Sequence, residues 1–429
     1  MARLLAGAAR ADMTPPLGIP LMGFWGPRNA TGIDTPLMAH ALVLDDGAGK
    51  LVFVALDLIA LEAKDVNEAK KQILARAGIA PERVLVSCSH THEAPYPCPC
   101  LGIDVEPDPA CMARVREAIV ESVTRAAGTM APADIGFGST QVPGICQNRR
   151  RLKGPNDVFN VWMLPKGAHL KYPPAGPVDE QLVLLAVRRE SGEPISLLWN
   201  FSLHAHAFAS SRVCADYPYY VWQKVAGELG GDPTCVFLPG ACGDINKIPD
   251  VPSQRVVDEL AGALVLLYHE AGFSAEAPLR ARLQPLEAPL RDFSAFQDEE
   301  IRRKMPGVIE ACRAEWEILR KVKERSVRTS VHAMSVGKFA VAAVPGEYFC
   351  ALGLNIKKRS PFALTAVAEL TDDYVGYIPT SEAFEQGGYE LFNLRTSKVA
   401  RGVGERMADD LARLLAELHG AGGGKERKK

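Results

Sequence analysis

Short continuous runs of apolar residues recur along the chain, and they predict buried β-strands. The first, Leu51-Val-Phe-Val-Ala-Leu56, ends at Asp57, as a buried strand of an α/β sheet does. Similar runs predict strands at 84–87, 195–200, 234–238 and 364–370. Residues 331–344 alternate around Val336-Gly337-Lys338, which predicts a β-hairpin.

Segments with the helical spacing of apolar residues separate these runs. Predicted helices cover 63–77, 110–127, 217–229, 254–270, 398–419 and a long charged segment, 292–324. Strands alternating with helices predict an α/β fold in which mixed, largely parallel β-sheets are flanked by helices. No linker marks a clear boundary, so residues 1–420 are predicted to form one domain, with the 292–324 helix as the best candidate for an internal junction. The basic segment 421–429 is predicted to be a disordered tail.

Composition narrows the class of protein. Of the 429 residues, 47% are hydrophobic and 23% are charged, which supplies a packed core and argues against a disordered chain. The 49 lysines and arginines nearly balance the 51 aspartates and glutamates, so no nucleic-acid partner is expected. No stretch approaches the roughly 20 apolar residues of a membrane span, and no signal peptide precedes Arg10. We therefore expect a cytoplasmic protein without an integral membrane segment, whose ten scattered cysteines are reduced.

Two His-x-His pairs each follow a predicted strand. His90 and His92 come after the strand at 84–87, and His204 and His206 come after the strand at 195–200. In an extended segment, residues i and i+2 share a face, so both members of a pair can point into one pocket. Neutral imidazole is the commonest metal ligand in proteins. A single pair could equally be two hydrogen-bonded histidines at a strand end, but the repetition favours a metal site.

Oxygen-bearing side chains occur in glycine-containing turns further along the chain. Asp244 and Asn246 follow the strand at 234–238 in a turn that could supply donors to a developing negative charge, or could simply be capped by the aspartate. Glu347 follows Pro345-Gly346, and Tyr377 follows Gly376. Taken singly, Glu347 could be a surface helix cap and Tyr377 a core tyrosine.

In their order along the chain, these segments resemble the catalytic domain of the neutral (alkaline, non-lysosomal) ceramidases. The resemblance spans most of the chain, and no single motif carries it. The matching segments are Gly7-Ala-Ala-Arg-Ala-Asp-Met-Thr-Pro-Pro16, Met22-Gly-Phe24, Ser89-His-Thr-His92, Asn148-Arg149, Phe201-Ser-Leu-His204, Gly243-Asp244, Pro345-Gly-Glu347, Gly376-Tyr-Ile-Pro-Thr380 and Gly388-Tyr-Glu390.

The resemblance implies a zinc hydrolase that cleaves an amide through a zinc-bound water. The zinc ligands that it implies are His90, His204, Glu347 and Tyr377. Such a set suits catalytic zinc, because three or four nitrogen and oxygen ligands leave one position open. Zinc lowers the pKa of a bound water to about 7 and polarises a carbonyl group.

Further site residues also follow from the resemblance. His92 would lie beside the metal and steer substrate or shuttle protons. Arg149 is implied to contact the substrate or an oxyanion, and Tyr389 to donate a hydrogen bond to the reacting group. Asn246 is a departure, because ceramidases carry a serine there. Asparagine can donate a hydrogen bond to an oxyanion but cannot carry a proton as a hydroxyl does.

The expected substrate also departs from that of the ceramidases. The chain ends soon after the 398–419 helix, so the C-terminal immunoglobulin-like domain of full ceramidases is absent, and no export signal is visible. These features favour a soluble N-acyl compound over ceramide as the small-molecule amide partner. The oligomeric state leaves no signature in the sequence.

The cysteine-containing segment 94–102 directly follows the first histidine pair and is predicted to form a wall of the pocket. Its Cys98 and Cys100 could bind a structural zinc with Cys88 and Cys111, but their spacing fits no common four-cysteine zinc pattern. A surface loop with reduced thiols is the favoured interpretation.

Two alternative functions remain open beside the zinc amide hydrolase. In the first, the two His-x-His pairs hold a dinuclear metal centre that hydrolyses an ester or lactone. In the second, the chain is a metal-stabilised binding protein with a decayed site. Asn246 favours the second alternative, whereas the complete set of four implied ligands counts against it.

Overall fold

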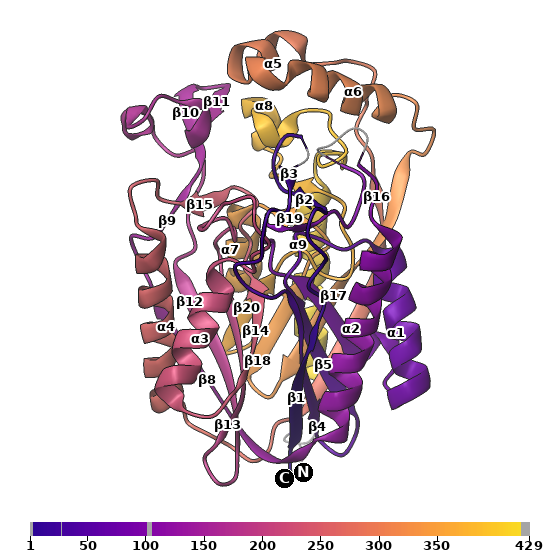
Figure 1. The fold of residues 1–429 in the computed structure, drawn as a ribbon, viewed down its shortest axis with the longest axis vertical. Helices are drawn as coiled ribbons and strands as arrows, with labels where there is room; N and C mark the ends of the chain where they lie inside the picture. Colours follow the sequence, from indigo (N-terminus) through magenta and orange to yellow (C-terminus); the bar gives the residue numbers. More distant parts are fainter. Residues whose placement is uncertain (1–2, 27, 101–104, 422–429) are drawn as a thin grey trace.

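An eight-stranded sheet crosses the molecule in the order β14-β13-β12-β8-β1-β4-β5-β6 (Figure 1). Its strands are β1 (Leu5–Asp12), β4 (Met38–Asp45), β5 (Lys50–Leu56), β6 (Val84–Cys88), β8 (Ala131–Gln141), β12 (Gln181–Arg189), β13 (Pro194–Phe201) and β14 (Thr234–Pro239). The structure is a computed structural model that describes residues 3–26, 28–100 and 105–421. Apart from Ala421, the predicted tail lies outside the described residues.

Most neighbouring strands of this sheet are antiparallel. Strands β13 and β14 pair in parallel, as do β5 and β6, and the other five neighbouring pairs are antiparallel. The α/β class and the mixed sheet are therefore confirmed, but the expectation of a largely parallel sheet is wrong. Short turns at 46–49 and 190–193 join β4 to β5 and β12 to β13, and connections this short require antiparallel neighbours.

A second, four-stranded sheet packs face to face against the first. It consists of β16 (Leu279–Pro289), β17 (Ser326–Val336), β18 (Phe339–Ala343) and β20 (Leu364–Ala368). One apolar core fills the space between the sheets, where Leu42 and Phe53 of the first sheet meet Met334 and Val341 of the second. The predicted hairpin is confirmed as β17–β18, which turns at Gly337 with a φ of 59°.

Helices cover the outer faces of both sheets (Figure 1). On the large sheet lie α1 (Ala63–Ala77), α2 (Pro109–Gly128), α3 (Tyr217–Leu229) and α4 (Ser253–Glu270), and on the second sheet lie α7 (Cys350–Arg359) and α9 (Val403–Gly420). The resulting layers run helix, sheet, sheet, helix. In β5, Val52 and Val54 face helices while Leu51 and Phe53 face the second sheet. Both faces of this strand are buried, which explains its continuous apolar run.

The predicted long helix at 292–324 is wrong. This segment forms α5 (Asp298–Lys304) and α6 (Ile309–Leu319), separated by a single turn at Pro306–Val308. Proline has no backbone N–H and its ring clashes with the preceding turn, so α5 cannot continue through Pro306. The last helix also begins later than predicted, at Val403, because Gly402 before it takes a left-handed φ of 87°.

Short elements gather at one end of the molecule, in its upper part in Figure 1. They are β2 (Pro20–Met22), β3 (Arg28–Asn29), β7 (Ala94–Pro95), β9 (Cys146–Asn148), β10 (Arg150–Gly154), β11 (Asp157–Asn160), β15 (Ile245–Lys247), β19 (Glu347–Tyr348), β21 (Tyr377–Ile378) and the helix α8 (Ala383–Gln386). Strands β6, β13, β14 and β18 lead into these elements or into the adjoining loops. No helix among the described residues is long and apolar enough to cross a membrane.

Candidate functional site

His90 lies in a sharp turn just after β6. Its φ of 68° is left-handed, so the chain does not continue as a strand, and the predicted alternation of His90 and His92 along an extended segment is wrong. The carbonyl oxygen of Ile59 lies 2.8 Å from His90 Nδ1 and can only accept, so Nδ1 carries a proton. His90 Nε2 lies 3.3 Å from Glu347 Oε2. Burial opposes protonation of His90, but the Glu347 carboxylate outweighs it and raises the pKa.

His204 reaches the same point from the end of β13. Its ring centroid lies 4.5 Å from that of His90, and its Nε2 lies 3.5 Å from Glu347 Oε2. Arg149 Nη1 lies 3.1 Å from the same His204 nitrogen. Because a guanidinium only donates, His204 Nε2 is an acceptor and the ring is neutral. Burial and the charge of Arg149 lower the pKa of His204 to about 3.

Glu347 is fixed beneath the two histidines by β19. This strand pairs in parallel with β21, which places Glu347 directly opposite Tyr377. Tyr374 donates its hydroxyl to Glu347 Oε1 at 2.8 Å, whereas Glu347 Oε2 is buried without a hydrogen-bond partner. Burial alone would raise the pKa of Glu347, but His90 and His204 hold it well below its usual value. A Cβ at Gly243 would lie 2.5 Å from the Glu347 carbonyl oxygen, so only glycine permits this approach.

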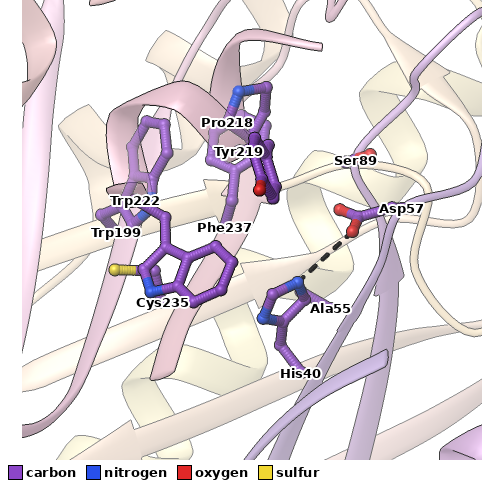
Figure 2. A pocket seen from close by; sticks show the side chains of 10 residues that line it. All are labelled: His40, Ala55, Asp57, Ser89, Trp199, Pro218, Tyr219, Trp222, Cys235 and Phe237. Atoms are coloured by element: carbon purple, nitrogen blue, oxygen red, sulfur yellow. Dashed lines mark hydrogen bonds and ion pairs between the residues drawn. The ribbon is translucent and has the colours of Figure 1, made fainter. Parts of the chain in front are cut away.

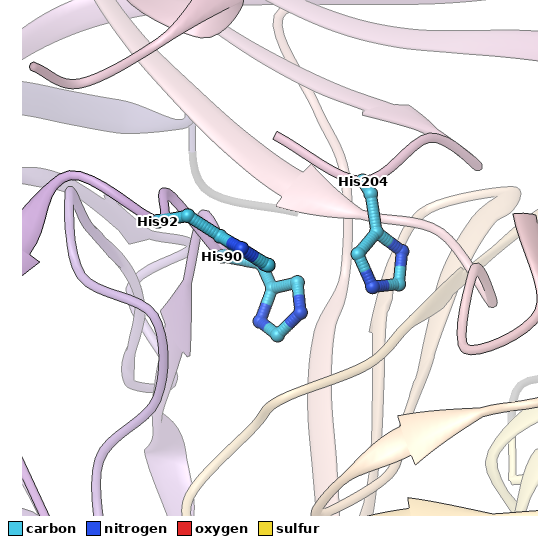
Figure 3. A group of neighbouring side chains, drawn as sticks. All are labelled: His90, His92 and His204. Carbon is cyan, nitrogen blue, oxygen red and sulfur yellow. The ribbon is translucent and has the colours of Figure 1, made fainter. Parts of the chain in front are cut away.

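His92 completes a cluster of three imidazoles with His90 and His204 (Figure 3). One potential ligand atom of each ring lies within 4.8 Å of the other two. Both ring nitrogens of His92 are buried without a partner, as is Nδ1 of His204. Unpartnered buried polar atoms are costly unless something binds them. The donors on these three rings and on Glu347 therefore fit a metal ion, and His92 belongs to the histidine cluster by position as much as His90 and His204 do.

Arg149 connects the histidine cluster to the predicted oxygen-bearing residues. It donates from Nη1 to Asn246 Oδ1 at 3.2 Å and from Nη2 to the Tyr377 hydroxyl at 3.0 Å. Its Nε donates to Glu390 Oε1 at 2.9 Å. Glu390 also accepts from Arg150 Nη1 at 2.8 Å, so one buried carboxylate holds two adjacent arginines. Burial would lower the pKa of Arg149, but Tyr377 and Glu390 raise it, so the guanidinium stays charged.

A cavity of about 330 Å³ opens above the histidine cluster. Six of the eight predicted site residues line it: His92, Arg149, His204, Asn246, Tyr377 and Tyr389. The other two, His90 and Glu347, lie just below it in contact with His204. The rest of the lining consists of Gly23, Phe24, Trp25, Trp162 and His206. We call this space the aromatic cavity, because rings make up most of its wall.

Sequence reasoning missed several residues of this site. His206 belongs to the second His-x-His pair, and Phe24 and Glu390 lie in segments that carried the resemblance, so a signal for them existed. Tyr374 lies three residues before the predicted Tyr377. Trp162 lies in a single 3-10 turn, Val161–Met163, that no sequence pattern predicts, and only the tertiary fold brings it to the cavity wall.

The cysteine-containing segment after His92 does not line the aromatic cavity. Cys98 and Cys100 are buried, with exposed fractions of 3% and 2%, so the predicted surface loop is wrong. Their sulfur atoms lie 3.5 Å apart and face a separate cavity. Of the predicted wall segment, residues 101 and 102 lie outside the described residues.

A much smaller cavity lies near the end of β5 (Figure 2). Here His40 Nε2 lies 3.4 Å from Asp57 Oδ2, and Ser89 Oγ and Trp199 Nε1 are buried without partners. The free space is only about 10 Å³. That is about the space of one water molecule, which these polar atoms could bind, and it excludes a substrate.

Comparison with known proteins is consistent with this arrangement. The sequence model of the family described as neutral/alkaline non-lysosomal ceramidase, N-terminal, matches residues 4–215. The structure of neutral ceramidase from Pseudomonas aeruginosa shares the fold, with a TM-score of 0.76 at 14% sequence identity over 98% of this chain and 75% of that chain. A structure described as ceramidase complexed with C2 matches with a TM-score of 0.75 at 14% identity, over 98% of this chain and 76% of that chain.

Proposed function

Because this chain belongs to the neutral/alkaline non-lysosomal ceramidase family, we propose that it is a zinc-dependent hydrolase that cleaves the amide bond of an N-acyl compound. The observation that carries the proposal is the convergence of His90, His204 and Glu347 beneath the aromatic cavity, with His92 beside them and several of their polar atoms unpartnered. Neutral imidazoles with one carboxylate are the donor set of catalytic zinc sites.

The proposed zinc ligands are His90, His204, Glu347 and Tyr377. Bound zinc supplies Lewis acidity, which polarises a carbonyl group and acidifies water. Burial raises the pKa of Tyr377 well above its usual value against the lowering effect of Arg149, so Tyr377 would act as a ligand through the oxygen lone pairs of its neutral hydroxyl, which also accepts from Arg149 Nη2 at 3.0 Å. We place His92 beside the ligand set, as the resemblance to the ceramidases implies; its ring packs against Phe24 and His206, and the metal analysis below separates this place from a ligand role.

The remaining side chains bind and orient the substrate. Burial and the neighbouring His206 hold the pKa of His92 well below its usual value, so its ring is neutral, and both of its nitrogens are unpartnered. We propose that it relays a proton from water to the departing amine. Arg149, held by Glu390, presents a fixed positive charge to the carbonyl oxygen of the substrate. Tyr389 packs edge-on against Tyr377 and Trp162, and we propose that its hydroxyl donates a hydrogen bond to the reacting group.

The size of the aromatic cavity favours a compact substrate. Its volume of about 330 Å³ is at the low end of the ~300–1,000 Å³ that small-molecule sites enclose. A short or medium acyl chain can pack against Trp25 and Trp162 there. We therefore propose a soluble N-acyl compound, and we expect ceramide to be the poorer substrate.

Metal analysis tests the ligand assignment. The purified protein should contain about one zinc per chain, and His204→Ala should lose most of it. His92→Ala should keep the zinc but lose about 10²–10⁴-fold in kcat. His269→Ala, a change at an exposed histidine remote from the site, is the matched control and should alter neither quantity. Loss of zinc in His92→Ala as severe as in His204→Ala would make His92 a ligand.

The same measurements separate the alternative functions. Two metal equivalents per chain, with ester or lactone turnover above amide turnover, would replace the mononuclear amidase with a dinuclear hydrolase. One tightly bound zinc without turnover of any amide or ester would leave a binding protein.

A further inference from the structure

A second cavity adjoins the aromatic cavity. Its volume is about 240 Å³, and Trp162 and Asn246 line both spaces. Its other polar lining includes Gln147, Lys166 and Lys247. A substrate amide held at the histidine cluster carries an acyl chain on one side and an amine substituent on the other. The acyl chain can lie in the aromatic cavity while the amine half passes Asn246 into this second cavity.

Hydrogen-bond donors dominate the wall nearest the aromatic cavity. Gln147 and Asn246 are opposite each other in the β9–β15 pair. Asn246 Oδ1 accepts from Arg149, so the amide –NH2 of Asn246 points away from that arginine. Gln147 Oε1 accepts from Arg151, and Gln147 Nε2 is buried without a partner. The side-chain amides of Asn246 and Gln147 are thus each oriented by an arginine that donates to the amide oxygen, which leaves their –NH2 groups as donors to a ligand.

The charges at this second cavity favour a monoanion. Lys247 donates from Nζ to the carbonyl oxygens of Ile248 at 3.3 Å and Val251 at 2.5 Å, which leaves one of its three N–H groups for a ligand. Lys166 contributes a second, exposed ammonium. Asp250 supplies one negative charge, so the lining carries a net charge of about +1, counting two lysines against one aspartate.

We infer that the substrate is an N-acyl amino acid, whose carboxylate binds in the second cavity. This inference rests on the proposed function and names the amine half of its substrate. A carboxylate only accepts hydrogen bonds, so it matches the donors of Gln147, Asn246 and Lys247, and its single charge matches the lining. Hydrolysis breaks the amide C–N bond and forms a C–O bond from water, and the released amino acid takes the proton on its nitrogen.

Asn246 acquires a role in this arrangement. At this position the ceramidases that the chain resembles carry a serine, whose hydroxyl has one donor on a shorter side chain. The asparagine spans from Arg149 to the second cavity, accepting on one side and donating on the other. The departure from the ceramidase pattern is thus explained by a substrate that carries an acceptor just beyond the amide.

A matched pair of substrates tests the inference. N-octanoylglycine and N-octanoylglycinamide have the same length and differ only in the terminal carboxylate. The zinc-loaded wild-type protein should favour the acid by about tenfold or more in kcat/KM, since hydrogen bonds to a charged group are the stronger kind. Lys166→Met should reduce this preference several-fold, and Gln147→Met should do the same. Lys171→Met, a change at an exposed lysine outside the second cavity, is the control and should preserve the preference.

Binding provides a readout that is independent of turnover. Trp162 lines both cavities, so quenching of tryptophan fluorescence by the acid, but not by the amide, should report occupancy in wild-type protein and weaken in Lys166→Met. Equal kcat/KM for the two substrates would overturn the inference and leave the proposed amidase intact. Absence of hydrolysis of every amide, charged or neutral, would refute the proposed function and this inference with it.

Discussion

Asp372 connects two segments that carry site residues, namely β6 with the turn at His90 and the segment that leads to Tyr377. It accepts from Lys70 Nζ at 2.8 Å and from the backbone N–H of Val86 at 3.0 Å, and its other oxygen lies 2.9 Å from His332 Nδ1. All of these side chains are buried. Val86 lies in β6, four residues before His90, and Asp372 lies five residues before Tyr377. We predict that Asp372→Asn destabilises the fold strongly.

The magnitude follows from the charge of Asp372. Burial would raise the pKa of this carboxyl, but Lys70 and His332 lower it from about 3.8 to about 2. At about 1.4 kcal/mol per pKa unit, this difference corresponds to about 2–3 kcal/mol of folding free energy. Because the folded pKa is depressed, this contribution is complete above about pH 5 and is lost as the pH falls toward 2, with roughly half gone at pH 3. Asparagine also leaves Lys70 buried without a counter-charge, so the total cost at pH 7 should be about 3–5 kcal/mol.

Urea unfolding of the metal-free protein, followed by tryptophan fluorescence, measures this cost. Asp372→Asn should lower the free energy of unfolding by about 3–5 kcal/mol at pH 7 and by clearly less at pH 3. The double variant Asp372→Asn/Lys70→Met should recover much of the loss, because it no longer buries a lone charge. Asp258→Asn, at an exposed ion pair, is the control and should change stability by less than about 1 kcal/mol. A cost below about 1 kcal/mol for Asp372→Asn, or one that is equal at both pH values, would refute the reasoning.

Three further changes test the site itself. Tyr374→Phe removes the hydrogen bond to Glu347 Oε1 and should weaken zinc binding about 10–100-fold in competition with a chromophoric chelator; unchanged affinity would show that this bond does not orient the carboxylate. Glu390→Gln removes the charge that holds Arg149 and should lower kcat about tenfold or more at unchanged zinc content, whereas wild-type kinetics would mean that Arg149 is held without it. Gly243→Ala places a Cβ 2.5 Å from the Glu347 carbonyl oxygen, so it should cost about 1–3 kcal/mol in thermal unfolding and reduce zinc content; no change in either would mean that the strand shifts freely.

The helices and the fully buried strands were predictable because their signals are local. Strand β5 is apolar on both faces since helices cover one face and the second sheet covers the other. The helix α3 was predicted at its observed bounds, Tyr217–Leu229. The long charged helix failed because its polar pattern was read through Pro306-Gly307, where the backbone cannot continue an α-helix. The antiparallel direction of the central strands is set by their short connections, which the apolar runs alone do not reveal.

The residues that the sequence proposes for the site lie together in the structure, but their contacts with one another were not predictable. The predicted residues lie either just after a strand or in a short strand or single helical turn that follows a glycine, and such positions collect at one end of an α/β sheet. The contact between Arg149 and Glu390 joins positions 241 residues apart, so no local pattern could predict it. The same holds for Trp162, which forms the wall between the two cavities.

The two histidine pairs lie close together for a different reason than the His-x-His spacing predicts. An extended strand would have placed His90 and His92 on one face, but His90 is left-handed and its chain turns sharply. The pair that converges most closely joins the two strands instead, since the ring centroids of His90 and His204 lie 4.5 Å apart and those of His90 and His92 lie 5.0 Å apart. A metal site needs donors from separate elements around one point, and the folded core supplies that through β6, β13 and β19 together. The spacing of a His-x-His pair therefore identifies candidate ligands, while the packing of the two sheets decides which of them face a common ion.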